Sequence, residues 1–135
     1  MFSSIKTSEA NKQRVTELTN KLQLGTENVI ARIALSYSLA KSEPLVLKSI
    51  QDSKGKEYSK RVLFGDNLPF YIALVCQRYQ IYKTNQEVPR YLKLHIDDGL
   101  ERIHNEVTDN PNLLGTEFLL NLIEEGMAKI SDNVQ

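Results

Sequence analysis

The stretch "KQRVTELTNKLQLGTENVIARIALSYSLA", residues 12–40, predicts two amphipathic helices separated by a tight turn. In its first half, Val15, Leu18 and Leu22 recur at three- and four-residue spacing, which places them on one face of a helix. Gly25 then supplies the left-handed backbone conformation that commonly ends a helix. We therefore expect one helix before this glycine and a second helix after it.

The second of these helices, over residues 26–40, is apolar on more than one face. Thr26 can cap its first turn. The apolar positions are Val29, Ile30, Ile33, Ala34, Tyr37 and Ala40. One small domain cannot cover so wide an apolar surface, so we expect the helix to pack against its own domain and against another chain. We predict a homo-oligomer, expected to be a tetramer, with an interface that includes Ile30, Ile33 and Tyr37.

The rest of the chain also favours helices, apart from the segment 45–63. There, short runs of branched residues flank the polar stretch "QDSKGKEYS", so a short hairpin or a long ordered loop fits best. The helix before Gly25 is expected at residues 9–23. Three further helices are expected at residues 66–82, 88–107 and 115–130. We predict a mainly α, single compact domain over 1–135, with a helical hairpin in 1–43, a basic hairpin or loop in 44–65 and a helical remainder in 66–135.

The composition is that of an ordinary globular protein, with 135 residues, 41% hydrophobic side chains and 25% charged ones. No apolar run approaches the roughly 20 residues that span a bilayer, and no signal-peptide pattern follows the first residue. We therefore predict a cytoplasmic protein with no membrane segment. The single cysteine, Cys76, lies among apolar residues at helical spacing and is predicted to belong to the core.

The charge is distributed unevenly, although the formal net charge is zero. Residues 1–61 contain 11 Lys and Arg against 6 Asp and Glu, whereas residues 62–135 contain 6 against 11. The first part therefore carries a net charge of +5 and the second part −5. A basic half is the expected footprint of a surface that binds phosphates, and the alternative is two solvated faces whose imbalance has no function.

Two groups of basic residues could form such a surface. The first lies in the turn-like segment "DSKGKEYSKR" and consists of Lys54, Lys56, Lys60 and Arg61. The second surrounds the first helix and consists of Lys6, Lys12, Arg14 and Lys21. Both groups suit contact with a sugar–phosphate backbone, and together they could form a continuous track on an oligomer. The alternative is that the lysines of the loop serve only solubility.

No motif in the sequence requires an enzyme. Gly-rich phosphate loops and Gly-x-Ser-x-Gly nucleophile motifs are missing. The cluster "LHIDDGLERIH" contains His95, Asp97 and Asp98, but the two histidines have no zinc-like spacing, and helix-surface charge pairing is the preferred interpretation. We predict no catalytic residue, no metal site and no cofactor.

Several pieces of the sequence, in order, resemble the DndE family, the small subunit of the bacterial DNA sulfur modification (phosphorothioation) system. They are "SSIKTS", "KLQLGTENVIARIALSYSLA", "DSKGKEY", "LFG", "YIALVCQ" and "LHIDDGLE". The resemblance covers residues 1–105 and assigns no role to residues 113–135. It implies a non-catalytic, homotetrameric DNA-binding subunit that prefers nicked duplex, with an N-terminal part, residues 1–43, similar to ribbon-helix-helix repressors.

The resemblance also implies partners. These are a cysteine desulfurase, an adenylating iron–sulfur protein and an SMC-like ATPase, which together replace a non-bridging phosphate oxygen of DNA with sulfur. We therefore expect an accessory subunit that binds duplex DNA mainly through its backbone. Two alternatives stay open: a ribbon-helix-helix transcriptional repressor or antitoxin-like regulator, and a nuclease or carboxylase-like enzyme centred on His95, Asp97 and Asp98.

Overall fold

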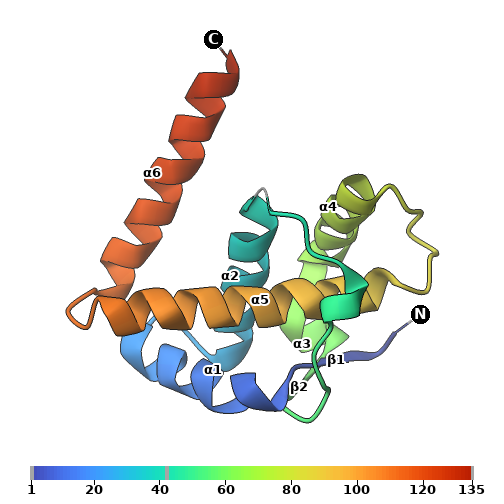
Figure 1. Ribbon diagram of the computed structural model, residues 1–135, viewed down its shortest axis with the longest axis horizontal. Helices are drawn as coiled ribbons and strands as arrows, with labels where there is room; N and C mark the ends of the chain where they lie inside the picture. The colour runs from blue at the N-terminus through green and yellow to red at the C-terminus, as the bar shows by residue number, and fades with distance from the viewer. Residues whose placement is uncertain (1, 42, 135) are drawn as a thin grey trace.

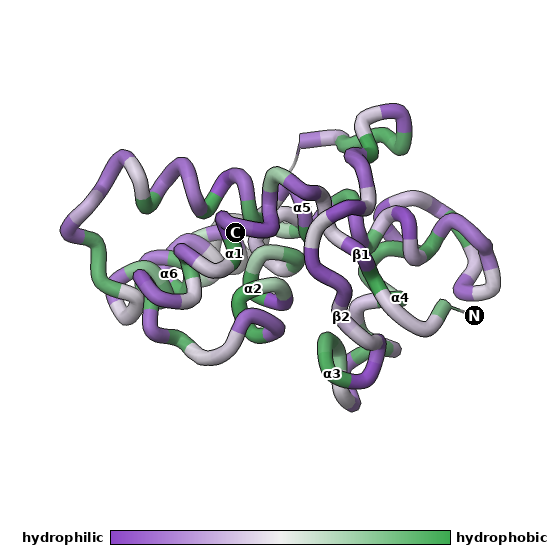
Figure 2. The backbone as a smooth tube through the Cα atoms, turned by 90° about the horizontal axis from the view of Figure 1, so that it is seen from below, coloured by the Kyte–Doolittle hydropathy of each residue, from purple (hydrophilic) through white to green (hydrophobic). Residues whose placement is uncertain are grey.

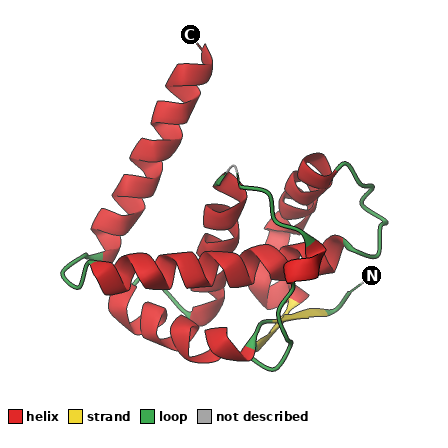
Figure 3. Cartoon of the chain, in the orientation of Figure 1, coloured by secondary structure: helices red, strands yellow, loops and turns green. Residues whose placement is uncertain are grey.

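The computed structural model describes residues 2–41 and 43–134 and is built almost entirely of helices (Figure 1, Figure 3). In chain order the elements are β1 Ser4–Lys6, α1 Glu9–Leu22, α2 Glu27–Ala40, a 3-10 turn at Leu47–Ser49, β2 Glu57–Ser59, the short α3 Lys60–Phe64, a 3-10 turn at Gly65–Asn67, α4 Leu68–Tyr79, α5 Val88–Asp109 and α6 Gly115–Val134. The mainly α prediction is confirmed.

The helical hairpin that decides the fold forms as α1 and α2, with different ends from those expected. Ser8 caps α1, because its hydroxyl accepts a hydrogen bond from the backbone N–H of Asn11. The helix ends at Gln23, which adopts the left-handed conformation with φ 55°. The helix was expected to end at residue 23 and its last residue is Leu22, but the left-handed residue that follows it is Gln23 and not Gly25. Thr26 precedes α2, but its side chain caps no backbone N–H.

α5 lies at the centre of the molecule, and α2 packs across it (Figure 1). The core lies around this crossing and includes fully buried Leu35, Leu92, Ile96 and Leu100. In Figure 2, α2 carries several strongly hydrophobic positions, in agreement with its place beside the core. Cys76 is half-buried and packs against the edge of the same core.

Ile30 requires a correction, because it was expected at an interface between chains. Its side chain is completely buried inside the chain's own core. The helix turns this face toward α5. Ile33 and Tyr37 are only partly buried, so they remain available to a second chain.

The two short strands pair antiparallel with each other, with Ile5 opposite Tyr58 and Lys6 opposite Glu57. Ile5 and Tyr58 face the core, and Lys6 and Glu57 are exposed, as the alternation of a strand requires. Residues 57–59 therefore pair with the start of the chain and not with residues 45–50. Of the two structures expected for residues 45–63, an ordered loop with one 3-10 turn forms up to residue 56. Residues 57–59 form a strand with a different partner, and residues 60–63 belong to the helix α3, which was not expected.

α6 is the only long helix of the described residues that projects from the body (Figure 1). Phe118 anchors its first turns, since 1% of that residue is exposed. Farther along, Leu120, Ile123 and Met127 are 53%, 57% and 65% exposed. None of the described helices is long and apolar enough to cross a membrane.

Candidate nucleic-acid interface

The loop of residues 52–56, which carries Lys54 and Lys56, is held against the start of α1 by hydrogen bonds from backbone N–H groups. The Asp52 carboxylate accepts from the backbone N–H of Glu9 at 2.9 Å and from that of Lys54 at 3.0 Å. These bonds, the one from Glu9 first, lower the pKa of Asp52. The N–H of Gly55 binds the carbonyl of Thr7 at 2.9 Å. The loop carrying Lys54 is therefore an ordered part of this surface.

A buried ion pair between Lys93 and Asp97 of α5 holds the same region in place. One oxygen of Asp97 accepts from the backbone N–H of Ser8 at 3.0 Å and from the Asn11 amide at 2.8 Å. Its other oxygen lies 2.7 Å from the ammonium of Lys93. Lys93 in turn donates to the carbonyl of Asp52 at 2.7 Å. One carboxylate of α5 thus joins the start of α1 to the loop.

The eight predicted DNA-binding residues fall into two groups in the structure. Lys6, Lys12, Lys54 and Arg61 are exposed, and the described residues give them no ion-pair partner. The other four have intramolecular contacts that use part of their binding capacity. They are Arg14, Lys21, Lys56 and Lys60.

The contacts of this second group differ in kind. Lys56 forms an ion pair with Glu27 at 2.9 Å, so its charge is partly neutralised. The ammonium of Lys60 lies 5.8 Å from the ring centre of Phe2, and Arg14 donates to the side chain of Asn11 at 3.2 Å. Lys21 donates to the carbonyl of Pro111, beside the turn that leads to α6. Lys21 therefore lies near the far end of α1, about 13 Å along the helix from Lys12.

Sequence reasoning missed two basic residues beside this surface: Arg90, which is exposed, and Lys93, which is buried and already paired with Asp97. A shallow depression of about 260 Å³ lies between β1, the loop and the first turn of α5. Its lining includes Ser4, Lys6, Ser53, Arg90 and Lys93. Arg90 and Lys93 belong to the acidic half of the sequence, so their position beside Lys6 could not be seen from charge counts. Hydroxyls and cations around one depression are groups that commonly contact phosphate oxygens.

His95 occupies a different place, at the junction of α2, α4 and α5. The ring is completely buried, with Nε2 2.6 Å from the Tyr79 hydroxyl and Nδ1 2.8 Å from that of Ser38. Ser38 donates to Asp98 at 2.7 Å, and Arg102 donates to the same carboxylate oxygen at 2.9 Å. Because Ser38 donates to Asp98, it accepts from Nδ1–H, and Nε2 accepts from Tyr79. This series of hydrogen bonds links α2, α4 and α5.

The ionisation of His95 follows from its surroundings. Burial first, and the positive charge of Arg78 second, lower its pKa to about 4, with a smaller opposite effect from Asp98. The ring is therefore neutral at physiological pH, in agreement with a single N–H on the ring. Among the described residues, no group of three or more His, Cys, Asp and Glu side chains is arranged to hold a metal ion.

This pKa predicts a pH dependence of stability. An unfolded chain binds the proton of His95 near pH 6.5, whereas the folded chain binds it near pH 4. The stabilisation is therefore complete above about pH 6.5 and is lost as the pH falls toward 4. Across this window we expect the free energy of unfolding to fall by about 3 kcal/mol more in the natural protein than in His95→Gln. Denaturant titrations at several pH values measure the difference.

The second histidine provides the control. His104 is partly exposed and pairs with Glu17 at 2.7 Å. The variant His104→Gln should therefore keep the loss of stability between pH 6.5 and 4. A result in which His104→Gln removes the pH dependence and His95→Gln leaves it intact would contradict the assignment.

The fold and the exposed charges define a class: a small, mainly helical protein with a basic surface around the start of α1 and buried polar links between its helices. The chain belongs to the family of the DNA sulphur modification protein DndE, because the family's sequence model matches residues 4–110. The match ends before α6, which begins at Gly115.

Two crystal structures share this fold. One is DndE from Escherichia coli B7A, involved in DNA phosphorothioation modification, with 16% identity, a TM-score of 0.62 and a match covering 74% of this chain and 96% of that one. The other is a DndE mutant involved in DNA phosphorothioation, with 17% identity, a TM-score of 0.63 and coverage of 76% and 98%. No curated protein matches the chain.

Proposed function

We propose that this protein is a non-catalytic, cytoplasmic subunit of the DNA phosphorothioation system that binds duplex DNA, preferably nicked, through its sugar–phosphate backbone. Family membership supports the link to DNA sulphur modification. The observation that carries the binding mode is the exposed group Lys6, Lys12 and Lys54, on segments that Asp97 and Asp52 join by hydrogen bonds at the start of α1. Charged side chains on an ordered surface suit phosphates, which carry no base identity.

Arg90 extends this proposed surface onto α5. Its guanidinium forms an ion pair with Glu87 at 2.6 Å, and both side chains are substantially exposed. A phosphate could replace Glu87 as the partner of Arg90 while Lys6 contacts the same phosphate across the depression. Arg90 therefore joins the proposed DNA-binding residues, whereas Lys56, paired with Glu27, is expected to contribute less than the loop sequence suggested.

The salt dependence of DNA binding tests this proposal. Each lost phosphate contact should flatten the plot of log affinity against log salt by about 0.9, and it should weaken binding about eightfold at 0.1 M salt. We expect this result for Lys6→Glu, Lys54→Glu and Arg90→Glu on duplexes of any sequence. Fluorescence anisotropy between 50 and 200 mM salt, with intact and nicked duplex, gives the slopes.

A matched charge reversal serves as the control. Lys129→Glu on α6 changes the charge by the same amount, and Lys129 lines the groove between α2 and α6 and not the proposed DNA surface, so its solution mass is measured beside its salt slope. Its salt slope should equal that of the natural protein. The proposed surface is wrong if the Lys6, Lys54 and Arg90 variants behave like this control. If only Lys12→Glu and Arg14→Glu flatten the slope, DNA lies along α1 and the loop lysines only aid solubility.

The repressor alternative has weaker structural support. In ribbon-helix-helix proteins the N-terminal strand pairs with the same strand of a second chain and reads bases in the major groove. Here β1 pairs with β2 of its own chain, and Lys6 is its one long polar side chain. Competition with random duplex separates the two functions, because a repressor would prefer one operator by a factor of about 10³ or more.

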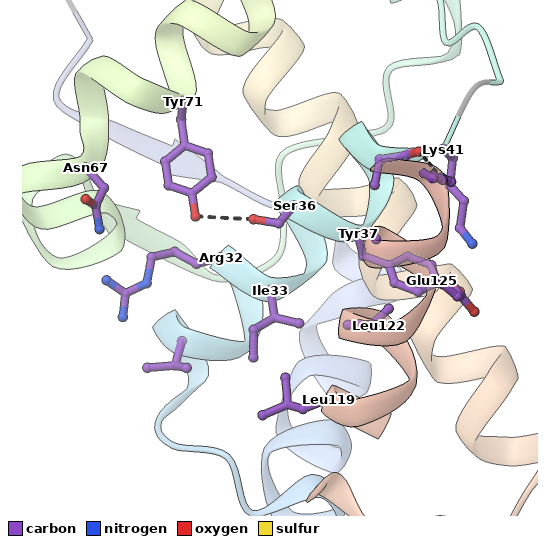
Figure 4. A pocket seen from close by; sticks show the side chains of 14 residues that line it. Arg32, Ile33, Ser36, Tyr37, Lys41, Asn67, Tyr71, Leu119, Leu122 and Glu125 are labelled. Atoms are coloured by element: carbon purple, nitrogen blue, oxygen red, sulfur yellow. Dashed lines mark hydrogen bonds between the residues drawn. The ribbon is translucent and has the colours of Figure 1, made fainter. Parts of the chain in front are cut away.

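We also propose that the protein is a homotetramer and that one interface uses the groove between α2 and α6. The groove has a volume of about 480 Å³ (Figure 4). Ile33 and Tyr37 line it from α2, and Leu119 and Leu122 line it from α6. An exposed groove with this largely apolar lining commonly binds another protein chain. The other subunits of the system are the further proposed partners.

Substitutions on α2 test this interface. Ile33→Asp should lower the solution mass while the protein stays folded, because Ile33 is only partly buried. Ile30→Asp should instead unfold the chain, because it places an unpaired charge in the core. Light scattering and circular dichroism distinguish the two outcomes. A folded Ile33→Asp protein with the natural mass would exclude the groove as an interface.

A further inference from the structure

A second cavity adjoins the depression that Lys6 and Arg90 line. It has a volume of about 530 Å³ and lies between the start of the chain and the segment that connects α4 to α5. These two segments lie at the same end of the molecule in both views (Figure 1, Figure 2). Pro89 lines this pocket and the depression alike, so the two cavities are neighbours. The pocket is lined by Phe2, Val88, Pro89 and residues 83–86.

The two cavities differ in chemistry. The lining of the depression includes three basic side chains and two hydroxyls. One of them, Lys93, donates to Asp97 and to the carbonyl of Asp52, which leaves the third N–H of its ammonium for a ligand. The larger pocket instead combines the rings of Phe2 and Pro89 with side-chain amides. A cationic site beside a ring with amides matches the two parts of a nucleotide, its phosphate and its base.

The groups of the larger pocket are held by the rest of the protein. The ring of Phe2 meets the buried ring of Phe64 edge to face, with 6.4 Å between the ring centres and an angle of 84°. The side-chain oxygen of Asn85 accepts a hydrogen bond from the backbone N–H of Glu87 at 2.8 Å. Its amide nitrogen remains a donor for acceptors on the edge of a base. Groups fixed in this way lose little entropy when a ligand binds.

The spacing of the two cavities follows from the start of the chain. The backbone N–H of Lys60 donates to the carbonyl of Ser3, which continues the pairing of β1 with β2 by one residue. Phe2 in the pocket and Ser4 in the depression are therefore separated by two residues of extended chain, about 7 Å. This length is comparable with the separation of phosphate and base within one nucleotide.

We propose that the two cavities hold one nucleotide whose base has left the duplex stack, with its phosphate in the depression, its sugar over Pro89 and its base against Phe2. This inference rests on the proposed function and names the ligand of the depression. A base leaves the stack at the lowest cost where its strand is interrupted, so a nicked duplex is the favoured ligand. Stacking tolerates any base, and the site therefore adds no sequence preference.

Two nicked duplexes that differ in a single base test the site. Each carries one unpaired nucleotide at the nick: a thymidine in the first duplex, and an abasic tetrahydrofuran residue with the same phosphate in the second. We expect the natural protein to bind the thymidine duplex about fivefold or more tightly, because stacking of one base on an aromatic ring contributes at least this factor. Fluorescence anisotropy measures both affinities.

Phe2→Leu should bring the ratio of the two affinities close to one. The leucine keeps an apolar side chain beside Phe64 but removes the ring. Affinity for the abasic duplex should stay unchanged, which shows that the variant is folded. Tyr82→Leu is the matched control, since it also replaces an aromatic ring by leucine in the segment between α4 and α5. Tyr82 is 85% exposed and lies outside the lining of the pocket, so this variant should keep the natural ratio.

Equal affinity of the natural protein for the two duplexes would overturn the site, as would a Phe2→Leu protein that keeps the natural ratio. The salt dependence separates this failure from that of the proposed function. If the affinities are equal while Lys6→Glu and Arg90→Glu still flatten the salt slope, backbone binding stands and only the base pocket is lost. If the natural protein shows no salt slope with either duplex, both proposals are wrong.

Discussion

Replacing Asp97 with alanine should lower the free energy of unfolding by about 3–5 kcal/mol, because the ammonium of Lys93 would be left buried without its counter-charge. The side chain of Lys93 is 8% exposed and that of Asp97 is 2% exposed. The backbone N–H of Ser8 and the amide of Asn11 would lose their acceptor as well. Urea denaturation of the natural and variant proteins measures the change.

Two variants separate the charge from the other effects of this substitution. Glu101→Ala changes an exposed carboxylate of the same helix and should alter stability by less than about 0.5 kcal/mol. Removing both partners, in Asp97→Leu with Lys93→Met, should recover part of the loss, because no unpaired charge remains. If Asp97→Ala is no less stable than Glu101→Ala, the buried ion pair does not support this fold.

Gly99→Ala should have an effect of similar size, through the backbone. A Cβ at position 99 would stand 1.9 Å from the carbonyl oxygen of Ala34, so α2 and α5 could not keep their present separation. Since the obstacle is helix backbone and not a flexible side chain, we expect a loss of about 3 kcal/mol or more. Thermal and urea unfolding both report it.

Gly126→Ala is the matched control, because it makes the same change inside a helix where the added methyl group has nothing within 4 Å. Alanine favours helix over glycine, so this variant should be more stable by about 0.5–1 kcal/mol. The two substitutions should therefore have opposite signs. Equal effects would mean that the crossing of α2 and α5 is not as close as described.

The sequence determined the helices of this protein, since their apolar spacing and end signals are local. The spacing of Val15, Leu18 and Leu22 predicted α1, and all three are buried. Pro44 and Pro111 lie outside the helices, because the residue before a proline disfavours the helical conformation. Two errors lay at the ends of α4, since residues 65–67 form a 3-10 turn and Gln80, with φ 55°, ends the helix before residue 82. A third was the helix α3, which forms at residues 60–64 where a hairpin or loop was expected.

The candidate site was only partly visible in the sequence. Local composition marked the loop lysines and the lysines around α1. It could not show that Glu27 neutralises Lys56, nor that Arg90 of α5 lies beside Lys6 of β1. These pairs join residues 29 and 84 positions apart, and no local pattern encodes such contacts.

Only the tertiary structure decided which apolar and polar residues are buried within the chain and which stay exposed. On α2, Ile30 and Ile33 look equivalent in sequence, but the packing of the other helices buries the first and leaves the second in the groove. In the cluster that suggested charge pairing on a helix surface, His95 and Asp97 are buried, whereas Asp98 is partly exposed and Glu101 is exposed. Helical periodicity is a property of one segment, whereas burial depends on which other segments pack against it, and that depends on the whole chain.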